Sequence, residues 1–93
     1  MQFDWNNKKA NLNLKKHGVN FEEAKTVFGD PLARIFDDEE HSAEERRDGI
    51  IGHSLKNRLL IISFTERANE TIRIISARET TLTERRKYEN ENG

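Results

Sequence analysis

Four arginines in the second half of the chain are suited to bind phosphate. They are Arg46, Arg67, Arg73 and Arg78. All lie in or beside segments that we expect to form the last three strands. A guanidinium group stays charged and can hold two phosphate oxygens at once, so it can stabilise a developing negative charge. The alternative is that each arginine forms an ion pair with a nearby carboxylate such as Glu45, Glu66 or Glu79.

Arginine itself is a poor proton acceptor, because its pKa lies above about 12. Acid–base chemistry therefore needs other side chains. The candidates are Glu45, Glu66, His17, His53, Lys16 and Tyr88. Tyr88 could equally anchor the last helix. His17 lies on the apolar side of an expected helix, which favours a structural role.

Strand alternation sorts the arginines by sheet face. Even-numbered residues of the last strand should share one face and odd-numbered residues the other. Arg73 and Arg78 thus begin on opposite faces, unless the chain turns after Ser76. We expect Arg46, Arg67 and Arg78 to form a cluster near the ends of the sheet.

The residues offer no recognisable metal site. The histidines at positions 17, 41 and 53 have no acidic neighbours at ligand spacing, and the chain has no cysteine. The lack of cysteine also excludes disulfides. We therefore expect neither a metal nor another cofactor.

The net charge of −1 conceals an uneven distribution. Residues 1–35 carry a net +2, residues 36–45 carry −6, and residues 46–93 carry +3. One segment thus holds the acidity while the rest is mildly basic. Binding of a polyanion depends on local potential rather than on total charge. A solvated, charged surface without such a partner is the plain alternative.

Length and hydropathy limit the location and size of the protein. No stretch approaches the roughly 18 apolar residues that span a membrane, and the N-terminus lacks the apolar run of a signal peptide. With 93 residues, 33 % of them hydrophobic and 35 % charged, we expect one small domain, 1–93, in the cytoplasm.

Two helices are expected near the N-terminus. The first covers residues 7–17, where Ala10, Leu14 and His17 recur at helical spacing and form the expected buried face. It ends at Gly18, which can adopt the left-handed conformation that closes a helix.

The second helix begins at Asn20, and Glu23 completes a pattern like a capping box. It ends at Gly29, shortly before a proline. Because so little chain joins the two helices, we expect an antiparallel hairpin.

Strands are expected on both sides of this hairpin. A short one opens the chain in residues 2–5, and three or four follow it. The candidate segments are 32–36, 47–54, 58–66 and 70–77. A closing helix over about 81–90 begins with a second capping box. The expected order is β-α-α-β-β-β-α, an α+β fold whose helical hairpin packs on one face of a small antiparallel sheet.

Five stretches carry a resemblance to a known family. They are NLKKHGVNFEEAKTVFGDPLA (13–33), EER (44–46), RLLIISFTER (58–67), IRIISAR (72–78) and ERRKYE (84–89). Together they resemble the BrnT toxin family, and their order and spacing fit from Phe3 to Tyr88. The one departure is Arg47, where the family usually has an apolar residue, which leaves the boundary of that strand open.

The resemblance implies a RelE-like ribonuclease toxin that arrests translation and is held inactive by a DNA-binding antitoxin of the BrnA type. RNA carries its own nucleophile, the 2′-hydroxyl, so cleavage needs a base, an acid and cations at the phosphate, without a metal. For such a site the expected catalytic residues are Arg46, Arg67, Arg78, Glu45 and Tyr88. The expected RNA-binding residues are Arg73, Lys16, His53 and Arg58.

Two points stay open from sequence. The same pattern fits a catalytically inactive relative that serves only as a co-repressor with a DNA-binding partner. The acidic segment 37–45 is either a solvated connection or a means of discriminating among RNA or ribosomal surfaces by repulsion.

Overall fold

The computed structural model of the chain describes residues 1–38 and 45–92. Its elements are β1 (Gln2–Asp4), α1 (Asn7–His17), α2 (Phe21–Thr26), the short 3₁₀ helix η1 (Val27–Gly29), β2 (Arg34–Asp37), β3 (Asp48–His53), β4 (Leu59–Arg67), β5 (Thr71–Glu79) and α3 (Leu82–Asn92). The α+β class is as predicted. His41 and most of the acidic segment lie outside the described residues. None of the described helices is long and apolar enough to cross a membrane.

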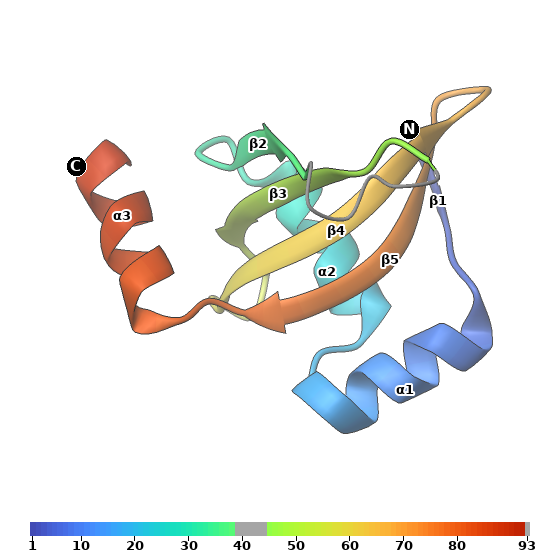
Figure 1. The fold of residues 1–93 in the computed structure, drawn as a ribbon, viewed down its shortest axis with the longest axis horizontal. Coiled ribbons are helices and arrows are strands. Elements are labelled where there is room, and N and C mark those ends of the chain that lie inside the picture. The colour runs from blue at the N-terminus through green and yellow to red at the C-terminus, as the bar shows by residue number, and fades with distance from the viewer. Residues whose placement is uncertain (39–44, 93) are drawn as a thin grey trace.

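The strands form one mixed sheet in the order β1-β5-β4-β3-β2 (Figure 1). Strands β2 to β5 form the expected antiparallel meander, whereas β1 pairs in parallel with β5. The predicted order therefore has one strand fewer than the structure. The prediction of a wholly antiparallel sheet is wrong. A parallel pair needs a long connection, and here two helices and most of the meander separate β1 from β5.

Strand β3 forms despite its two glycines because both face side chains that need the space. A Cβ atom on Gly49 would lie 2.2 Å from Cζ of Phe36, and one on Gly52 would lie 2.8 Å from Cβ of Ala33. The glycines that weaken the strand signal thus permit close packing on opposite faces of the sheet.

Helix α1 has the predicted bounds, and its predicted buried face is confirmed only in part. Gly18 closes it with φ +70° and donates its N–H to the carbonyl of Leu14 at 2.9 Å. Ala10 packs against the core and His17 is half-buried, whereas Leu14 is exposed and Asn13 is buried in its place. The Asn13 amide bonds the carbonyls of Val19 and Ala77 at 2.9 and 2.8 Å and accepts the Ala77 N–H at 3.1 Å. A polar residue therefore ties α1 to β5.

Helices α1 and α2 cover one face of the sheet, as predicted, but they are not an antiparallel pair. Figure 1 shows α2 crossing behind the strands while α1 lies below them, and α1 packs mainly on β5. The core between helices and sheet consists of Val19, Phe21, Ala24, Val27, Ile50, Leu60, Ile62, Phe64, Ile72, Ile74 and Ala77. Phe21 and Trp5 meet edge to face at 5.9 Å.

A β-bulge in β5 changes which side chains share a face. Ser63 pairs with Ser76 and Phe64 pairs with Ile74, so Ile75 has no partner on β4. Beyond the bulge the alternation is reversed, and Ala77 rather than Ser76 enters the core. The expected face assignment is therefore wrong past Ile74.

The consequence for the arginines follows from the same bulge. Arg73 alternates with the buried Ile72 and Ile74, and Arg78 follows the buried Ala77. Both arginines thus point to the sheet face opposite α1 and α2, which α3 borders at one end. We refer to this as the open face.

Candidate functional site

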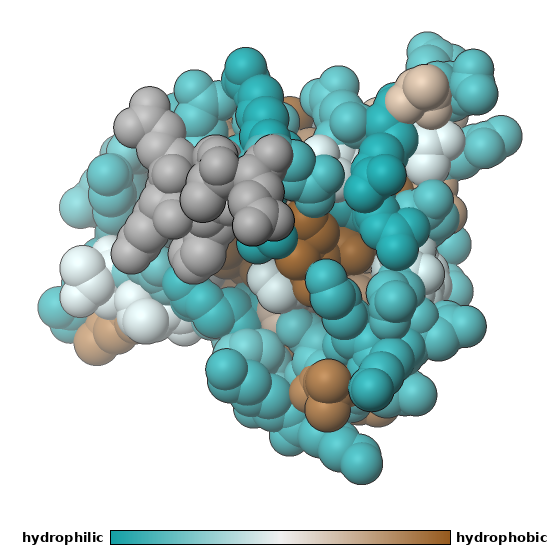
Figure 2. Space-filling view, turned by 45° about the vertical axis from the view of Figure 1, so that its right-hand side comes forward, coloured by the Kyte–Doolittle hydropathy of each residue, from teal (hydrophilic) through white to brown (hydrophobic). Residues whose placement is uncertain are grey.

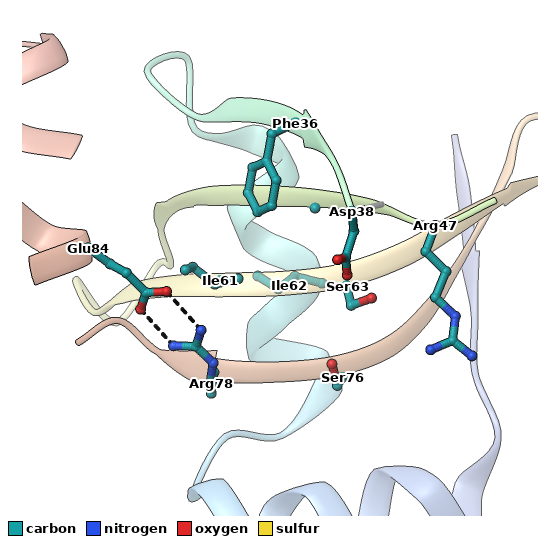
Figure 3. Close-up of a pocket in the computed structure, with 10 residues that line it drawn as sticks. Phe36, Asp38, Arg47, Ile61, Ile62, Ser63, Ser76, Arg78 and Glu84 are labelled. Atoms are coloured by element: carbon teal, nitrogen blue, oxygen red, sulfur yellow. Dashed lines mark hydrogen bonds and ion pairs between the residues drawn. The ribbon is translucent and has the colours of Figure 1, made fainter. Parts of the chain in front are cut away.

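A cleft of about 270 Å³ lies on the open face. Its lining residues are Phe36, Asp38, Arg47, Gly49, Ile61, Ile62, Ser63, Ser76, Arg78 and Glu84 (Figure 3). Figure 2, which brings another side of the molecule forward, shows an apolar patch near its centre with hydrophilic side chains beside it. The cleft combines two cations, two carboxylates and two hydroxyls, so its formal charges balance.

The register of the sheet places six of these lining residues in two rows. One row runs across the strands from Phe36 through Gly49 and Ser63 to Ser76. The second row is offset from the first by two residues along each strand, and its member on β5 is Arg78. Directly paired residues of a sheet point to the same face, so the two rows together form the floor of the cleft.

Arg78 and Glu84 form a bidentate ion pair at one end of the cleft. Nη1 and Nη2 of Arg78 donate to the two carboxylate oxygens of Glu84 at 2.8 and 2.9 Å. This hydrogen bonding lowers the pKa of Glu84 to about 2 and raises the pKa of Arg78. Glu84 is therefore ionised at neutral pH and fixes the plane of the guanidinium group.

The same carboxylate caps helix α3. The N–H of Thr81 donates to Oε1 of Glu84 at 2.8 Å, and the N–H of Glu84 donates to the hydroxyl of Thr81 at 3.2 Å. This is the reciprocal capping box predicted from the sequence. Because Glu84 serves both the cap and Arg78, the start of α3 is fastened to β5.

Arg78 keeps part of its hydrogen-bonding capacity. Glu84 takes the Nη1–Nη2 edge, and Nη1 also donates to the carbonyl of Glu79 at 3.1 Å. Within residues 1–38 and 45–92, no partner takes the Nε–Nη2 edge, which is the second bidentate edge of a guanidinium group. The side chain is 39 % exposed. Arg78 can thus hold an oxyanion while Glu84 keeps it in place.

Comparison with known proteins places the chain in a family. A family described as the ribonuclease toxin BrnT of a type II toxin–antitoxin system matches residues 5–84. The chain belongs to the BrnT family. Membership makes it a ribonuclease toxin of a type II system, which acts on RNA and has a protein antitoxin.

A solved BrnT structure has the same fold. The crystal structure of the Brucella abortus ribonuclease toxin BrnT aligns with a TM-score of 0.69 and 23 % sequence identity, over 87 % of this chain and 97 % of the other. No curated protein matches the chain. The BrnT resemblance expected from the sequence is therefore confirmed.

In this BrnT chain the expected arginine cluster does not form as a whole. Arg78 lies opposite Ile61, near the start of β4, whereas Arg67 ends that strand opposite Thr71. Six residues of strand, roughly 20 Å, separate the two ends. The prediction that Arg78 joins Arg46 and Arg67 is therefore wrong, because opposite ends of two long strands carry them.

Arg46 and Arg67 form ion pairs at their own end of the sheet. Nη2 of Arg46 contacts Asp37 at 2.9 Å, and its Nε lies 3.6 Å from Asp48. Arg67 pairs with Glu45 at 3.7 Å. Glu45 thus lies outside the cleft, and these contacts are the ion pairs that the sequence left open as the alternative.

Arg73 and Lys16 lie apart from the cleft lining. Arg73 shares the open face and contacts Asp4 of β1 at 3.1 Å. Lys16 is exposed near the end of α1, in the helical layer. Only Arg73 of these two expected RNA-binding residues therefore shares a face with Arg78.

Arg58 is structural. Its Nε and Nη2 donate to the buried carboxylate of Glu23 at 2.9 and 2.5 Å, and Nη2 also donates to the carbonyl of Gly18 at 3.0 Å. Glu23 accepts a further bond from the hydroxyl of Ser54 at 2.7 Å. Arg58 therefore joins the helical layer to the β3–β4 turn, and its predicted RNA-binding role finds no support in its position.

Tyr88 anchors α3. Its hydroxyl donates to the carbonyl of Leu32 at 3.1 Å, and burial raises its pKa. Its ring meets that of His53 at 6.0 Å, and the backbone N–H of His53 donates to Asp30 at 2.8 Å. Of the two roles weighed for Tyr88, the structure shows the anchoring one, and His53 lies beside it, outside the cleft.

Sequence reasoning missed several cleft residues. Phe36, Asp38, Ser63 and Ser76 carry no local motif, and only the strand register brings them together. Glu84 did have a signal, since its capping box places it one turn into α3, close to the end of β5.

Proposed function

We propose that the chain is a metal-independent, RelE-like endoribonuclease that inhibits translation by cleaving RNA and is neutralised by a BrnA-type antitoxin. The observation that carries the proposal is Arg78. Its guanidinium group lines the open-face cleft, is held by Glu84, and keeps a second bidentate edge for a phosphate. A ribonuclease needs such a positioned cation at the scissile phosphate.

The reaction begins with the 2′-hydroxyl of the substrate. Its oxygen gives up its proton and attacks the adjacent phosphorus, the bond to the 5′-oxygen breaks, and the leaving oxygen takes a proton from water, so that the products are a 2′,3′-cyclic phosphate and a 5′-hydroxyl. Negative charge grows on the phosphoryl oxygens during this step, and the preorganised Arg78 stabilises that charge without having to move. Since RNA supplies the nucleophile and arginine the positive charge, the chemistry needs no metal.

The attacking hydroxyl must lose its proton, and two carboxylates line the cleft. Glu84 is bonded to Arg78 and Thr81 and has a pKa of about 2, which makes it a weak base at neutral pH. We therefore assign the proton to Asp38 and give Glu84 the role of positioning Arg78. Figure 3 shows the Asp38 carboxylate beside Ser63 and the Arg78 guanidinium beside Glu84, both in the lining of the same cleft.

Flanking phosphates of a bound RNA fit the arginines outside the cleft. Arg73 shares the open face, and Arg46 and Arg67 lie at the far end of the strands. Their exposed ion pairs contribute little to stability, so an RNA phosphate can replace the carboxylates at small cost. We assign these arginines to binding rather than to the chemical step.

The test is RNA cleavage in EDTA by the antitoxin-free protein. The wild type should leave 2′,3′-cyclic or 3′-phosphate ends, and Arg78→Ala should slow cleavage about 100-fold or more. Arg85→Ala is the matched control, because that arginine lies on α3 outside the cleft lining and forms an ion pair with Glu89 at 3.9 Å. A wild type inactive on both free and ribosomal RNA, or an Arg78→Ala variant as fast as wild type, contradicts the proposal.

Growth assays address the antitoxin. Expression of the chain alone should stop growth, and co-expression of the antitoxin should restore it. The outer edge of β2 is unpaired in the described sheet and borders the cleft through Phe36, so an extended antitoxin segment can add to it and cover the site. Harmless expression without the antitoxin would favour the inactive co-repressor instead.

A further inference from the structure

Phe36 is an aromatic side chain placed in the cleft rather than in the core. Its residue is 42 % exposed, and the tip of its ring occupies the space where a side chain at Gly49 would stand. The ring is therefore held over β3 by the lack of a Cβ atom beneath it. Figure 3 shows it reaching from β2 toward the middle strands, above the row that contains Ser63 and Ser76.

Ser63 is the polar counterpart of this ring. It pairs directly with Gly49 on one side and with Ser76 on the other. Its hydroxyl oxygen is buried and has no hydrogen-bond partner among the described residues. A buried polar atom without a partner is unfavourable, so this hydroxyl is suited to accept or donate a bond to a ligand that enters the cleft.

We propose that Phe36 and Ser63 form a nucleobase subsite beside the phosphate site at Arg78. The base stacks on the Phe36 ring, its polar edge bonds Ser63, and the exposed Ser76 supports the same edge. This inference rests on the proposed function and deepens it, because it names the groups that hold the nucleotide at the scissile phosphate. An aromatic platform suits single-stranded RNA, whose unpaired bases are free to stack.

The spacing of the two rows supports the arrangement. The Phe36 ring lies over Gly49 of β3, two strands from β5, and its row is offset from the Arg78 row by two residues. The ring and the Arg78 backbone are thus separated by roughly 10 Å across the strands and about 7 Å along them, a gap that a nucleotide and the long arginine side chain can bridge together. The remaining Nε–Nη2 edge of Arg78 can then take the phosphate of the nucleotide whose base contacts Phe36. One ligand thus satisfies the ring, the hydroxyl and the cation together.

Binding of a non-cleavable oligonucleotide tests the subsite. The probe is a fluorescent, single-stranded 2′-O-methyl RNA, measured by anisotropy. Phe36→Leu should weaken binding about 10- to 100-fold, and Phe36→Trp should restore it, because indole also stacks on bases. Ile35→Ala is the control, since its side chain on the same strand is 66 % exposed and does not line the cleft. Equal affinities of the wild type and Phe36→Leu, or no binding by the wild type, overturn the inference.

Three further variants separate ligand contact from folding. Ser63→Ala removes a hydroxyl without a described protein partner, so the fold should be as stable as wild type while binding falls about 5-fold or more. Gly49→Ala keeps the Phe36 ring but displaces it, since the new Cβ would lie 2.2 Å from Cζ. The double change Phe36→Leu with Gly49→Ala removes that clash and should fold well, yet bind as poorly as Phe36→Leu alone. A double variant that binds like wild type contradicts stacking on Phe36.

The outcome for the subsite can be separated from the outcome for the enzyme. If the wild type binds the probe and depends on Phe36, but cuts no RNA in any form, the proposed catalysis fails while the subsite stands. If the wild type cuts RNA and Phe36→Leu has the same KM and kcat, the subsite fails while the catalysis stands.

Discussion

Arg78 and Glu84 face each other across the junction of β5 and α3, joined by two parallel hydrogen bonds of 2.8 and 2.9 Å. The pair connects stability with chemistry, because the carboxylate that caps the last helix also sets the plane of the arginine in the cleft. Changes at this junction should therefore alter unfolding and RNA cleavage together.

The first prediction concerns the pH dependence of this pair. The pKa of Glu84 is lowered from 4.5 to about 2, chiefly by its hydrogen bonds to Arg78. A carboxyl group whose folded-state pKa is lowered stabilises the fold above its unfolded-state pKa and loses that effect as the pH falls. The contribution should therefore disappear between about pH 4.5 and pH 2. Since Arg78 is 39 % exposed, solvent screening limits it to about 1 kcal/mol.

Urea unfolding of the wild type and Glu84→Gln measures that contribution. Glu84→Gln should be less stable at pH 7, and the difference should shrink at pH 2.5. Glu89→Gln, which loses only an exposed pair with Arg85, should match the wild type at both values. A gap between wild type and Glu84→Gln that does not change with pH contradicts the assignment.

The second prediction concerns the carboxylate buried beneath the β3–β4 turn. The Glu23 side chain is 2 % exposed and accepts bonds from Arg58 and Ser54, and the bond from Arg58 is the main cause of its lowered pKa. Glu23→Ala leaves the Arg58 charge partly buried without its partner, at a cost of about 3 kcal/mol. Denaturant titration should show this loss, while Glu22→Ala, at a side chain 69 % exposed, should stay near wild type. Equal stability of the two variants would exclude a structural role for the pair.

The third prediction compares a glycine in a crowded position, Gly52, with one in open space, Gly29. A Cβ atom on Gly52 would lie 2.8 Å from Ala33 and 3.1 Å from Val27, so Gly52→Ala forces the core apart and should cost about 1–3 kcal/mol. A Cβ atom on Gly29 would have no other atom within 4 Å, so Gly29→Ala is the matched control. Thermal unfolding of both variants checks the difference, and a Gly52→Ala protein as stable as Gly29→Ala rules out the close packing.

The fourth prediction concerns the polar link between α1 and β5. Asn13→Ala removes three hydrogen bonds and leaves buried backbone groups of Val19 and Ala77 without partners, which should cost about 2–4 kcal/mol. Asn11→Ala, on the exposed side of the same helix, changes helix propensity equally and should be close to neutral. Chemical denaturation distinguishes them. Asn13→Ala matching Asn11→Ala would mean that apolar contacts alone hold α1.

Local signals in the sequence predict the helix ends well and the sheet less well. Gly18 and Asn20 carry capping chemistry that acts within a few residues, so α1 and α2 end and begin where expected. The parallel pairing of β1 and the bulge at Ile75 depend on contacts between distant segments. No short motif encodes such contacts.

The candidate site shows the same contrast between what local signals predict and what depends on contacts between distant segments. The sequence identifies Arg78 as a candidate, because an arginine side chain in a strand can bind phosphate, and this follows from the residue type alone. It could not tell that the bulge turns Arg78 and Arg73 to one face or that Phe36 enters the cleft over Gly49. It also placed Arg78 with Arg46 and Arg67, since alternation gives the face of a residue but not its position along the neighbouring strand.

The last prediction separates the two ends of the sheet by what each does to RNA. If Arg46 and Arg67 contact only flanking phosphates, the double change of both to alanine should raise KM and lower the salt dependence of binding by about 0.7 per lost contact, with little effect on kcat. Arg78→Ala should instead lower kcat, because Arg78 faces the charge that grows during the reaction. Steady-state cleavage at several salt concentrations measures both quantities. A double variant that loses kcat as severely as Arg78→Ala would move the chemical centre to the end of the sheet where Arg67 meets Glu45 at 3.7 Å.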